Sequence, residues 1–246
     1  MTNLLKGLAL SISMLSTLPF FKVHNFFRGI NGYAVMFYPL VGFIIGSILV
    51  LFYKLLYPYL PTFHLGIIIF GLWILLTGAL HLDGFCDTID GFFVPKDKAL
   101  KVMKDPHNGG MGMIFGGVFL ILKASSVAFF MKDVELFYYL LPLILMLARF
   151  NSVIAIFLYP YISKSGMGTL AKEEFKTTQF IFVLLYVIAL GMWISPVLIF
   201  ISFVVLAFVK YIFIKRYGGF NGDMYGFLIE ISELILLNTA LIGFSF

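Results

Sequence analysis

Three carboxylates lie close together in the first half of the chain: Asp83, Asp87 and Asp90, separated by four and three residues. On an α-helix these spacings place all three on one face, where like charges repel. They follow an apolar run, 55–80, in which His64 is the only ionisable residue apart from tyrosines. Charges near a bilayer are costly, so we expect a cation to neutralise them. Oxygen ligands favour a hard ion, Mg²⁺ or Mn²⁺, which keeps coordination positions for a substrate phosphate.

The alternative is a solvated acidic helix end, and two glycines inside the cluster count against it. Gly84 and Gly91 are poor helix formers, but they allow a bulky ligand to approach the backbone. His81 stands directly before the cluster. It is the best candidate for a general base that deprotonates a hydroxyl near neutral pH, and a structural hydrogen bond is the alternative role. We therefore expect His81 and the three aspartates to be catalytic.

A second acidic group lies near the C-terminus, where Asp223 is followed by Glu230 and Glu233. Asp223 and Glu230 are seven residues apart, as are Asp83 and Asp90, and seven residues are two helical turns. Each pair therefore shares one helix face. We expect the two groups to hold one or two Mg²⁺ ions against a diphosphate. The expected metal ligands are Asp83, Asp87, Asp90, Asp223 and Glu230.

Two basic residues, Lys123 and Arg149, lie inside apolar segments. Charged groups within a membrane usually pair in the protein interior or line a functional cavity. One interpretation makes both residues phosphate contacts, with Arg149 as the better bidentate clamp. The other interpretation has them neutralise Glu230 and Glu233 within the bundle.

The polar segment 92–107 and the glycine-rich stretch after it offer further contacts for an anion. Lys98, Lys101 and Lys104 recur every three residues and can share a helical face, which either contacts phosphate or is solvated. The stretch 108–112, Asn-Gly-Gly-Met-Gly, opens an apolar run. Free backbone amides at the start of a helix can receive an anion, and glycines that only pack membrane helices are the alternative.

Composition predicts an all-α, polytopic integral membrane protein with one domain, 1–246. Hydrophobic residues make up 61% of the chain and charged residues 12%, whereas soluble domains carry about 25% charged residues. Seven apolar segments are long enough to cross the ~30 Å hydrocarbon core. They are 32–53, 62–80, 108–131, 136–159, two halves of 177–209 separated near Pro196, and 224–246. Before them, 4–21 begins with a mildly amphipathic helix, for which an interfacial or re-entrant position is expected.

The distribution of Lys and Arg predicts the orientation. The segments 22–28, 96–104, 164–176 and 210–216 fall on one side and hold twelve of the 17 Lys and Arg residues, whereas the opposite loops hold two. The positive-inside rule places the acidic cluster at the cytoplasmic face of the cell (inner) membrane. The net charge of +5 therefore needs no nucleic-acid partner. Lipid is the expected surrounding, and a homo-oligomer is left open.

Four motifs in this order resemble the cobalamin synthase family, the adenosylcobinamide-GDP ribazoletransferases. They are GALHLDGFCDTIDGFF, KALKVMKDPHNGGMG, Arg149 and GGFNGDMYGFLIEISE. The family's first pattern matches His81, Asp83, Gly84, Asp87, Asp90 and Gly91, and its last pattern matches Gly218, Gly219, Gly222, Asp223, Gly226 and Glu230. The middle motif departs from the family, since Met103-Lys104-Asp105-Pro106-His107 stands where Met-x-Asp-Ser-Arg is expected.

The resemblance implies a Mg²⁺-dependent transferase. The ribose 3′-hydroxyl of α-ribazole, or of its 5′-phosphate, would attack the cobinamide-linked phosphorus of adenosylcobinamide-GDP. GMP would leave, and adenosylcobalamin or its 5′-phosphate would form. Lys104 or His107 would substitute for the missing arginine. The expected substrate and phosphate contacts are Lys104, Asp105, His107, Lys123, Arg149 and Gly222.

Three other functions remain open from the sequence. A CDP-alcohol phosphotransferase of lipid synthesis usually has Ala-Arg after its first Asp-Gly-x-x, where this chain has Asp87-Thr88. An intramembrane prenyltransferase also uses aspartates, at a different spacing. An ion-coupled transporter would fit broken helices and buried charges, but it needs its charges near the bilayer midplane. The three aspartates fall at the end of an apolar segment, which favours the enzyme.

Overall fold

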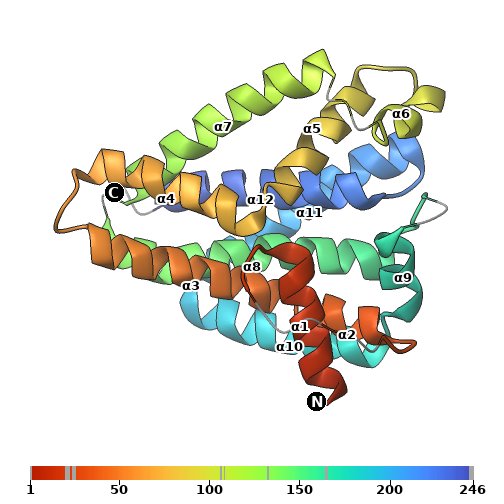
Figure 1. Ribbon diagram of the computed structural model, residues 1–246, viewed down its shortest axis with the longest axis horizontal. Coiled ribbons are helices and arrows are strands. Elements are labelled where there is room, and N and C mark those ends of the chain that lie inside the picture. The colour runs from red at the N-terminus through yellow and green to blue at the C-terminus, as the bar shows by residue number, and fades with distance from the viewer. Residues whose placement is uncertain are drawn as a thin grey trace.

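The computed structural model describes residues 2–19, 23, 26–105, 107, 109–131, 133–163 and 166–243 (Figure 1). Over these residues the chain forms twelve helices and no strand. In chain order they are α1 (Asn3–Leu15), α2 (Ile30–Met36), α3 (Tyr38–Leu56), α4 (Thr62–Thr77), α5 (Leu80–Phe92), α6 (Lys96–Val102), α7 (Gly110–Phe130), α8 (Val134–Leu158), α9 (Met167–Glu174), α10 (Thr177–Ile194), α11 (Pro196–Tyr217) and α12 (Gly222–Gly243).

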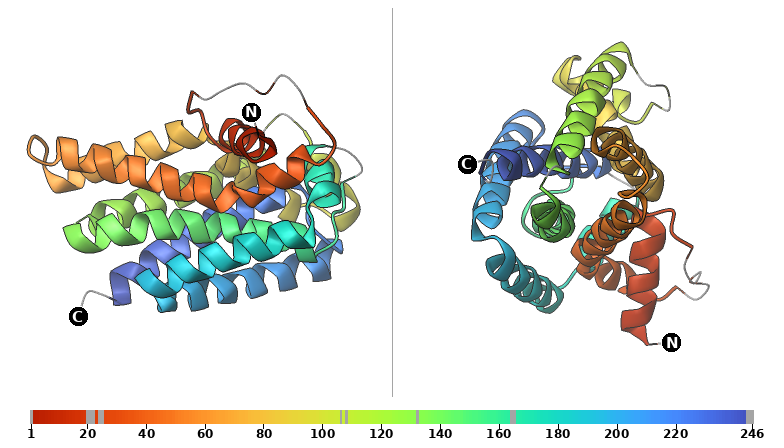
Figure 2. Two further views of the ribbon diagram at one scale, coloured as in Figure 1. Left: turned by 90° about the horizontal axis from the view of Figure 1, so that it is seen from below. Right: turned by 90° about the vertical axis from the view of Figure 1, so that its left-hand side faces the viewer.

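The expected polytopic helical bundle is confirmed. Six helices are long and apolar enough to cross a membrane, namely α3, α7, α8, α10, α11 and α12, and a bent pair formed by α4 and α5 brings the number to seven. The N-terminal helix α1 is shorter and runs across the direction of the long helices (Figures 1 and 2). Its interfacial or re-entrant position stays a prediction. Lys22, Lys132 and Lys164 of the charge count lie outside the described residues.

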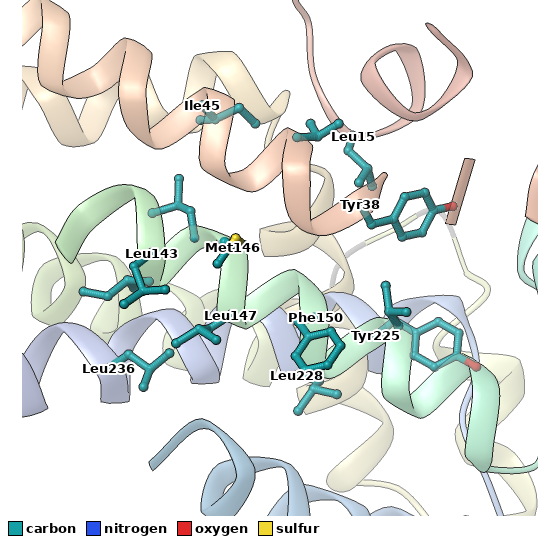
Figure 3. Packing of buried hydrophobic residues seen from close by; sticks show 14 of the residues in the cluster. Leu15, Tyr38, Ile45, Leu143, Met146, Leu147, Phe150, Tyr225, Leu228 and Leu236 are labelled. Atoms are coloured by element: carbon teal, nitrogen blue, oxygen red, sulfur yellow. The ribbon is translucent and has the colours of Figure 1, made fainter. Parts of the chain in front are cut away.

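Helix α8 is the centre of the bundle. In its most apolar stretch 94% of the residues are buried, and α3, α10, α11 and α12 pack around it (Figure 2). Its leucines and Phe150 meet the apolar faces of α3 and α12, as Figure 3 shows for Ile45, Leu228 and Leu236. Between membrane-spanning helices such contacts stabilise through van der Waals packing, since lipid tails are as apolar as these side chains. Because α3 and α12 both pack on this buried helix, their positions relative to each other are fixed.

The span expected at 62–80 is broken at its end. Helix α4 ends at Thr77, Gly78 and Ala79 both adopt left-handed backbone angles, and α5 leaves at 86° to α4. The last carbonyls of α4 are satisfied by the segment after α1, because Thr17 donates to Leu75 O and Leu76 O at 2.9 Å each. This break turns the aspartates of α5 toward the first turn of α12.

Candidate active site

The crossing of α5 and α12 brings the two acidic groups together. At Gly84, an added Cβ would lie 2.8 Å from the backbone oxygen of Asp223, and at Gly226 it would lie 3.0 Å from the carbonyl oxygen of His81. The helices therefore touch through their backbones. This corrects the expectation for two glycines: at Gly84 and Gly91 the space is filled by Asp223 and by the Met103 side chain, not left for a ligand.

A cavity of about 430 Å³ opens beside this crossing. His81 and Asp83 of α5 line it, as do Asp223 of α12 and Lys104 from the turn after α6. Asp87 interacts electrostatically with Asp83 and with Asp223, and Asp223 interacts with Lys104. The volume lies in the usual range for small-molecule sites, about 300–1,000 Å³. Gly222, an expected substrate contact, also lines the cavity.

Asp223 is held by Asn221, which the sequence reasoning did not assign. The Asn221 side chain accepts a hydrogen bond from the Met224 amide at 2.8 Å, as a helix cap does, and its amide donates to Asp223 Oδ2 at 3.0 Å. One residue therefore both starts α12 and orients its first carboxylate. An Asn shortly before the acidic residue of a helix start is the sequence signal that could have revealed this role.

Asp90 is used by the protein itself. Its Oδ2 accepts from the Gly109 amide and its Oδ1 from the Gly112 amide, both at 2.8 Å. The glycine-rich stretch thus receives an anion, as its sequence suggested, but that anion is the carboxylate of Asp90. Asp90 does not line the cavity. Its predicted roles as catalyst and metal ligand stay predictions, and its visible role is to fix the start of α7 on α5.

The second charged group lies behind the cavity, and we term it the ion cluster: Lys123, Arg149, Glu230 and Glu233. Lys123 Nζ donates to Glu230 Oε2 at 2.5 Å and also pairs with Glu233, which in turn pairs with Arg149. Lys123 lies over the ring of Trp73, 4.4 Å from its centroid. All four charges are buried and balance one another. The structure therefore favours the second of the two interpretations that the sequence left open.

His81 lies between the cavity and the ion cluster. It lines the cavity, it is buried, and its Nε2 has no hydrogen-bond partner among the described residues. Its surroundings include the charges of Arg149, Glu233 and Lys123. A neutral imidazole nitrogen without a partner can accept a proton from a hydroxyl that comes within hydrogen-bond reach.

Asp105 and His107 lie apart from the cavity lining. They form an exposed pair in the turn before α7, where His107 Nδ1 is 2.9 Å from Asp105 Oδ1. Hydrogen bonds from the His107 side chain and amide lower the pKa of Asp105. The two residues stay predicted substrate contacts. Of the two candidates to replace the missing arginine, Lys104 is the one that reaches the cavity.

The carboxylates at the cavity fit a hard cation in their chemistry. Over the described part of the chain, no Lys, Arg or His forms an ion pair with Asp83, Asp87 or Asp223. The same part contains no group of three or more His, Cys, Asp and Glu side chains close enough to hold a metal ion together. Mg²⁺ commonly binds one or two carboxylates and completes its shell with water and substrate phosphate. Two aspartates facing one cavity suit that pattern.

Three tyrosines also line the cavity and were not assigned from the sequence: Tyr38, Tyr161 and Tyr225. Burial, and after it the nearby Asp223 carboxylate, raise the pKa of Tyr161 despite its hydrogen bonds. The three come from separate parts of the chain. No spacing rule connects them, so only the fold could reveal them.

Comparison with known proteins identifies the family. The family described as "Cobalamin-5-phosphate synthase" matches residues 7–241. An adenosylcobinamide-GDP ribazoletransferase of Acinetobacter baumannii (strain ACICU) is 35% identical over 221 residues, 87% of this chain and 88% of that protein. One of Desulfitobacterium hafniense (strain Y51) is 32% identical over 210 residues, 82% and 83% of the two chains. No solved structure matches significantly. With its motifs, its bundle and these relatives, the chain belongs to the cobalamin-5-phosphate synthase family.

Proposed function

We propose that this protein transfers the cobinamide phosphate of adenosylcobinamide-GDP to α-ribazole or α-ribazole 5′-phosphate. The ribose hydroxyl oxygen forms a bond to the cobinamide-linked phosphorus, the bond from that phosphorus to the GMP oxygen breaks, and GMP leaves. The names of the relatives support the reaction. The observation that carries it is the convergence of Asp83, Asp223 and Lys104 on one cavity, from three separate parts of the chain.

The residues at the cavity have separate roles in the transfer. His81 Nε2 accepts the proton of the attacking hydroxyl, since this nitrogen has no partner among the described residues and His81 is one of the residues that line the cavity. Lys104 offers a positive charge to the diphosphate in place of the missing arginine. Asn221 keeps the Asp223 carboxylate in a fixed orientation. Backbone contact between α5 and α12 holds the two helices in register, so a small shift of either one would separate the carboxylates.

Asp83 and Asp223 would hold Mg²⁺, and Asp87 would add negative potential beside it. When bound, the metal supplies charge neutralisation for the diphosphate and the leaving GMP. The support is that these carboxylates form no ion pair among the described residues, and that their oxygens are hard ligands. Glu230 and Asp90 are weaker candidates for ligands, since both already have partners.

The test is GMP release by detergent-solubilised protein supplied with adenosylcobinamide-GDP, α-ribazole and Mg²⁺. We expect turnover that EDTA abolishes and that added Mg²⁺ or Mn²⁺ restores. A matched assay with α-ribazole 5′-phosphate decides which acceptor is preferred. Full activity in thoroughly chelated protein would refute the metal, and absence of GMP release with both acceptors would refute the reaction.

The cavity faces the cytoplasm in this proposal. The support is the charge asymmetry of the loops, because Lys104, which closely follows the Lys-rich α6, lines the cavity. Single cysteines placed at Lys98 and at Lys54, in a chain without Cys86, test it. Labelling of position 98 from outside intact cells by an impermeant maleimide would refute the orientation, with position 54, in the last turn of α3, as the matched site expected on the opposite side.

The transporter alternative rested on broken helices and buried charges. Both features are present, as the break between α4 and α5 and as the ion cluster. However, the charges of the ion cluster neutralise one another and do not line the 430 Å³ cavity. Among the described residues, the paired charges of the ion cluster therefore offer no free carboxylate to a transported ion.

A further inference from the structure

Two chemically different sets of residues line the cavity. One set is charged: Asp83, Asp223 and Lys104. The other set is Tyr38, Tyr161 and Tyr225, which we term the tyrosine wall, together with apolar side chains from α1, α8 and α9. These apolar residues are Met14, Leu15, Ile156, Met167 and Ala171. A ligand that fills such a cavity has a charged part and a flat apolar part.

Tyr161 is fixed in place although it lies outside the long helices. The segment after α8 pairs with the segment before α12: the Ile162 amide donates to Phe220 O, and the Phe220 amide donates to Pro160 O, both at 2.9 Å. This pairing sets the ring of Tyr161 parallel to that of Tyr225, with 6.1 Å between centroids and 20° between planes. On α9, an added Cβ at Gly168 would lie 2.4 Å from the Tyr161 hydroxyl oxygen. Any residue larger than glycine at this position would therefore displace the Tyr161 ring.

Tyr225 carries a hydroxyl group that needs a partner. The residue is 8% exposed, and its hydroxyl is buried without a hydrogen bond to any described residue. The hydroxyls of Tyr38 and Tyr161 lie close enough to interact with it electrostatically. Figure 3 shows the rings of Tyr38 and Tyr225 at the same end of the core. A buried polar group without a partner costs about 1–3 kcal/mol, which a ligand atom at this position would recover.

We propose that the tyrosine wall binds the flat bicyclic base of the acceptor nucleoside, stacked on the Tyr161–Tyr225 pair, with the Tyr225 hydroxyl donating to a ring nitrogen. The inference rests on the proposed function and adds the place and the chemistry of acceptor recognition. A cavity of about 430 Å³ admits a nucleoside but not a corrin ring, so the corrinoid stays outside it.

The apolar lining of the tyrosine wall favours the base of α-ribazole over the guanine of adenosylcobinamide-GDP. The base of α-ribazole is a dimethylbenzimidazole, which has an apolar edge and, once joined to ribose, a single free ring nitrogen. Guanine presents several donors and acceptors along its edge, and the apolar side chains of the wall would leave most of them unpaired. The Asp223 carboxylate interacts with Tyr161. A base on this wall therefore leaves its ribose beside the carboxylates and His81.

Kinetics of GMP release test the proposal, with each substrate varied while the other is saturating. Tyr161→Leu removes the stacking ring and should raise the KM for α-ribazole by about 10–100-fold, the range of a lost base–aromatic stack. Tyr161→Phe keeps the ring and should stay within about threefold of the wild type, because the hydroxyl it loses is bonded to protein side chains and not to the ligand. Tyr225→Phe should raise the same KM by about 3–10-fold, because it removes the hydrogen bond that the hydroxyl donates to the ligand. The KM for adenosylcobinamide-GDP should hold in all three.

Tyr159→Leu is the matched control, since Tyr159 stacks on Phe220 at 5.7 Å and does not line the cavity. It should leave both KM values unchanged. A rise in the donor KM alone would place guanine on the wall and overturn the proposal, as would unchanged KM values in Tyr161→Leu. If the wild type releases no GMP, the proposed function fails. Equilibrium dialysis of α-ribazole against the wild type and Tyr161→Leu then tests separately whether the tyrosine wall binds this nucleoside. Equal binding by the two proteins would overturn the proposal.

Discussion

Two groups of acidic residues a few helical turns apart have opposite surroundings. In the ion cluster, Glu230 and Glu233 are buried and paired with Lys123 and Arg149. At the cavity, Asp83 and Asp223 share a wall, and over the described residues no cationic side chain forms an ion pair with either. Buried charges persist only when they are paired, whereas an unpaired charge at a cavity is available to a ligand. The first group stabilises the bundle, and the second is placed for chemistry.

The two acidic motifs divide in the same way. Each contains a pair of acids seven residues apart, Asp83 with Asp90 and Asp223 with Glu230. In each pair the first acid lines the cavity and the second has a partner within the protein: Asp90 accepts hydrogen bonds from the amides at the start of α7, and Glu230 forms an ion pair with Lys123. Two helical turns carry the second carboxylate from the cavity into the packed interior.

Removing the cavity charges should give the largest effect on turnover. Asp83→Asn and Asp223→Asn should each lower kcat by about 10³-fold or more, in the range lost when a group that stabilises transition-state charge is removed. The double variant should cost little beyond either single one, because the two carboxylates act on the same centre. GMP release under saturating Mg²⁺ measures both statements.

The same variants should leave the fold intact, which separates the cavity from the ion cluster. Each substitution removes a negative charge from a group of like charges, so the thermal unfolding midpoint in detergent should stay equal or rise. Near-normal turnover in both single variants would contradict the role of the cavity. A large drop in the unfolding midpoint would show that these carboxylates are structural after all.

Removing one charge from the ion cluster should chiefly affect stability. Glu233→Gln leaves the Arg149 guanidinium, which is 0% exposed, without its anionic partner. Breaking a buried ion pair on one side costs about 3–5 kcal/mol. Thermal unfolding in detergent measures the loss, and Glu233→Gln with Arg149→Met should recover part of it, since no lone buried charge remains. Unchanged stability in Glu233→Gln would mean that water reaches the cluster.

A substitution at Asp90 tests whether this carboxylate is structural or belongs to the metal site. Asp90→Asn keeps a single acceptor oxygen for the Gly109 and Gly112 amides, so we expect a loss of about 1–3 kcal/mol in stability. The Mg²⁺ concentration for half-maximal GMP release should stay the same as in the wild type. A tenfold or larger rise in that concentration, with stability unchanged, would make Asp90 a metal ligand. The matched variant is Asp83→Asn, for which the opposite pattern is expected.

The sequence predicted the parts of this molecule that depend on hydropathy and local spacing. The spans followed from apolar length, and the carboxylate face of α5 followed from steps of four and three residues. Residue spacing predicts which face of a helix carries a side chain, but not which element packs against that face. The sequence therefore left the partners of Asp90 and Glu230 open. The left-handed Ala79 at the end of α4 has no signal of its own, since non-glycine residues rarely adopt that conformation. The tyrosine wall depends on the pairing of the segment after α8 with the segment before α12, which local spacing does not predict.

A carboxylate at the surface gives the smallest expected effect and completes the series. Glu174 Oε2 in α9 accepts from the Asn31 amide at 2.9 Å and from its side chain at 2.8 Å, and so ties α9 to α2. Burial alone would raise the pKa of Glu174, but these hydrogen bonds and one from the Gly29 amide lower it below its usual value of 4.5. A lowered folded pKa stabilises the contact at every pH above 4.5, and the contribution is lost as the pH falls through the folded value. Because the group is partly solvated, we expect the contact to contribute less than about 1 kcal/mol to stability.

Proteolysis of the α9 segment at pH 6 and pH 3.5 measures this contribution, with Glu174→Gln as control. The wild type should be cleaved faster at the lower pH relative to the variant, and an identical pH dependence in both would assign the acid sensitivity to other groups.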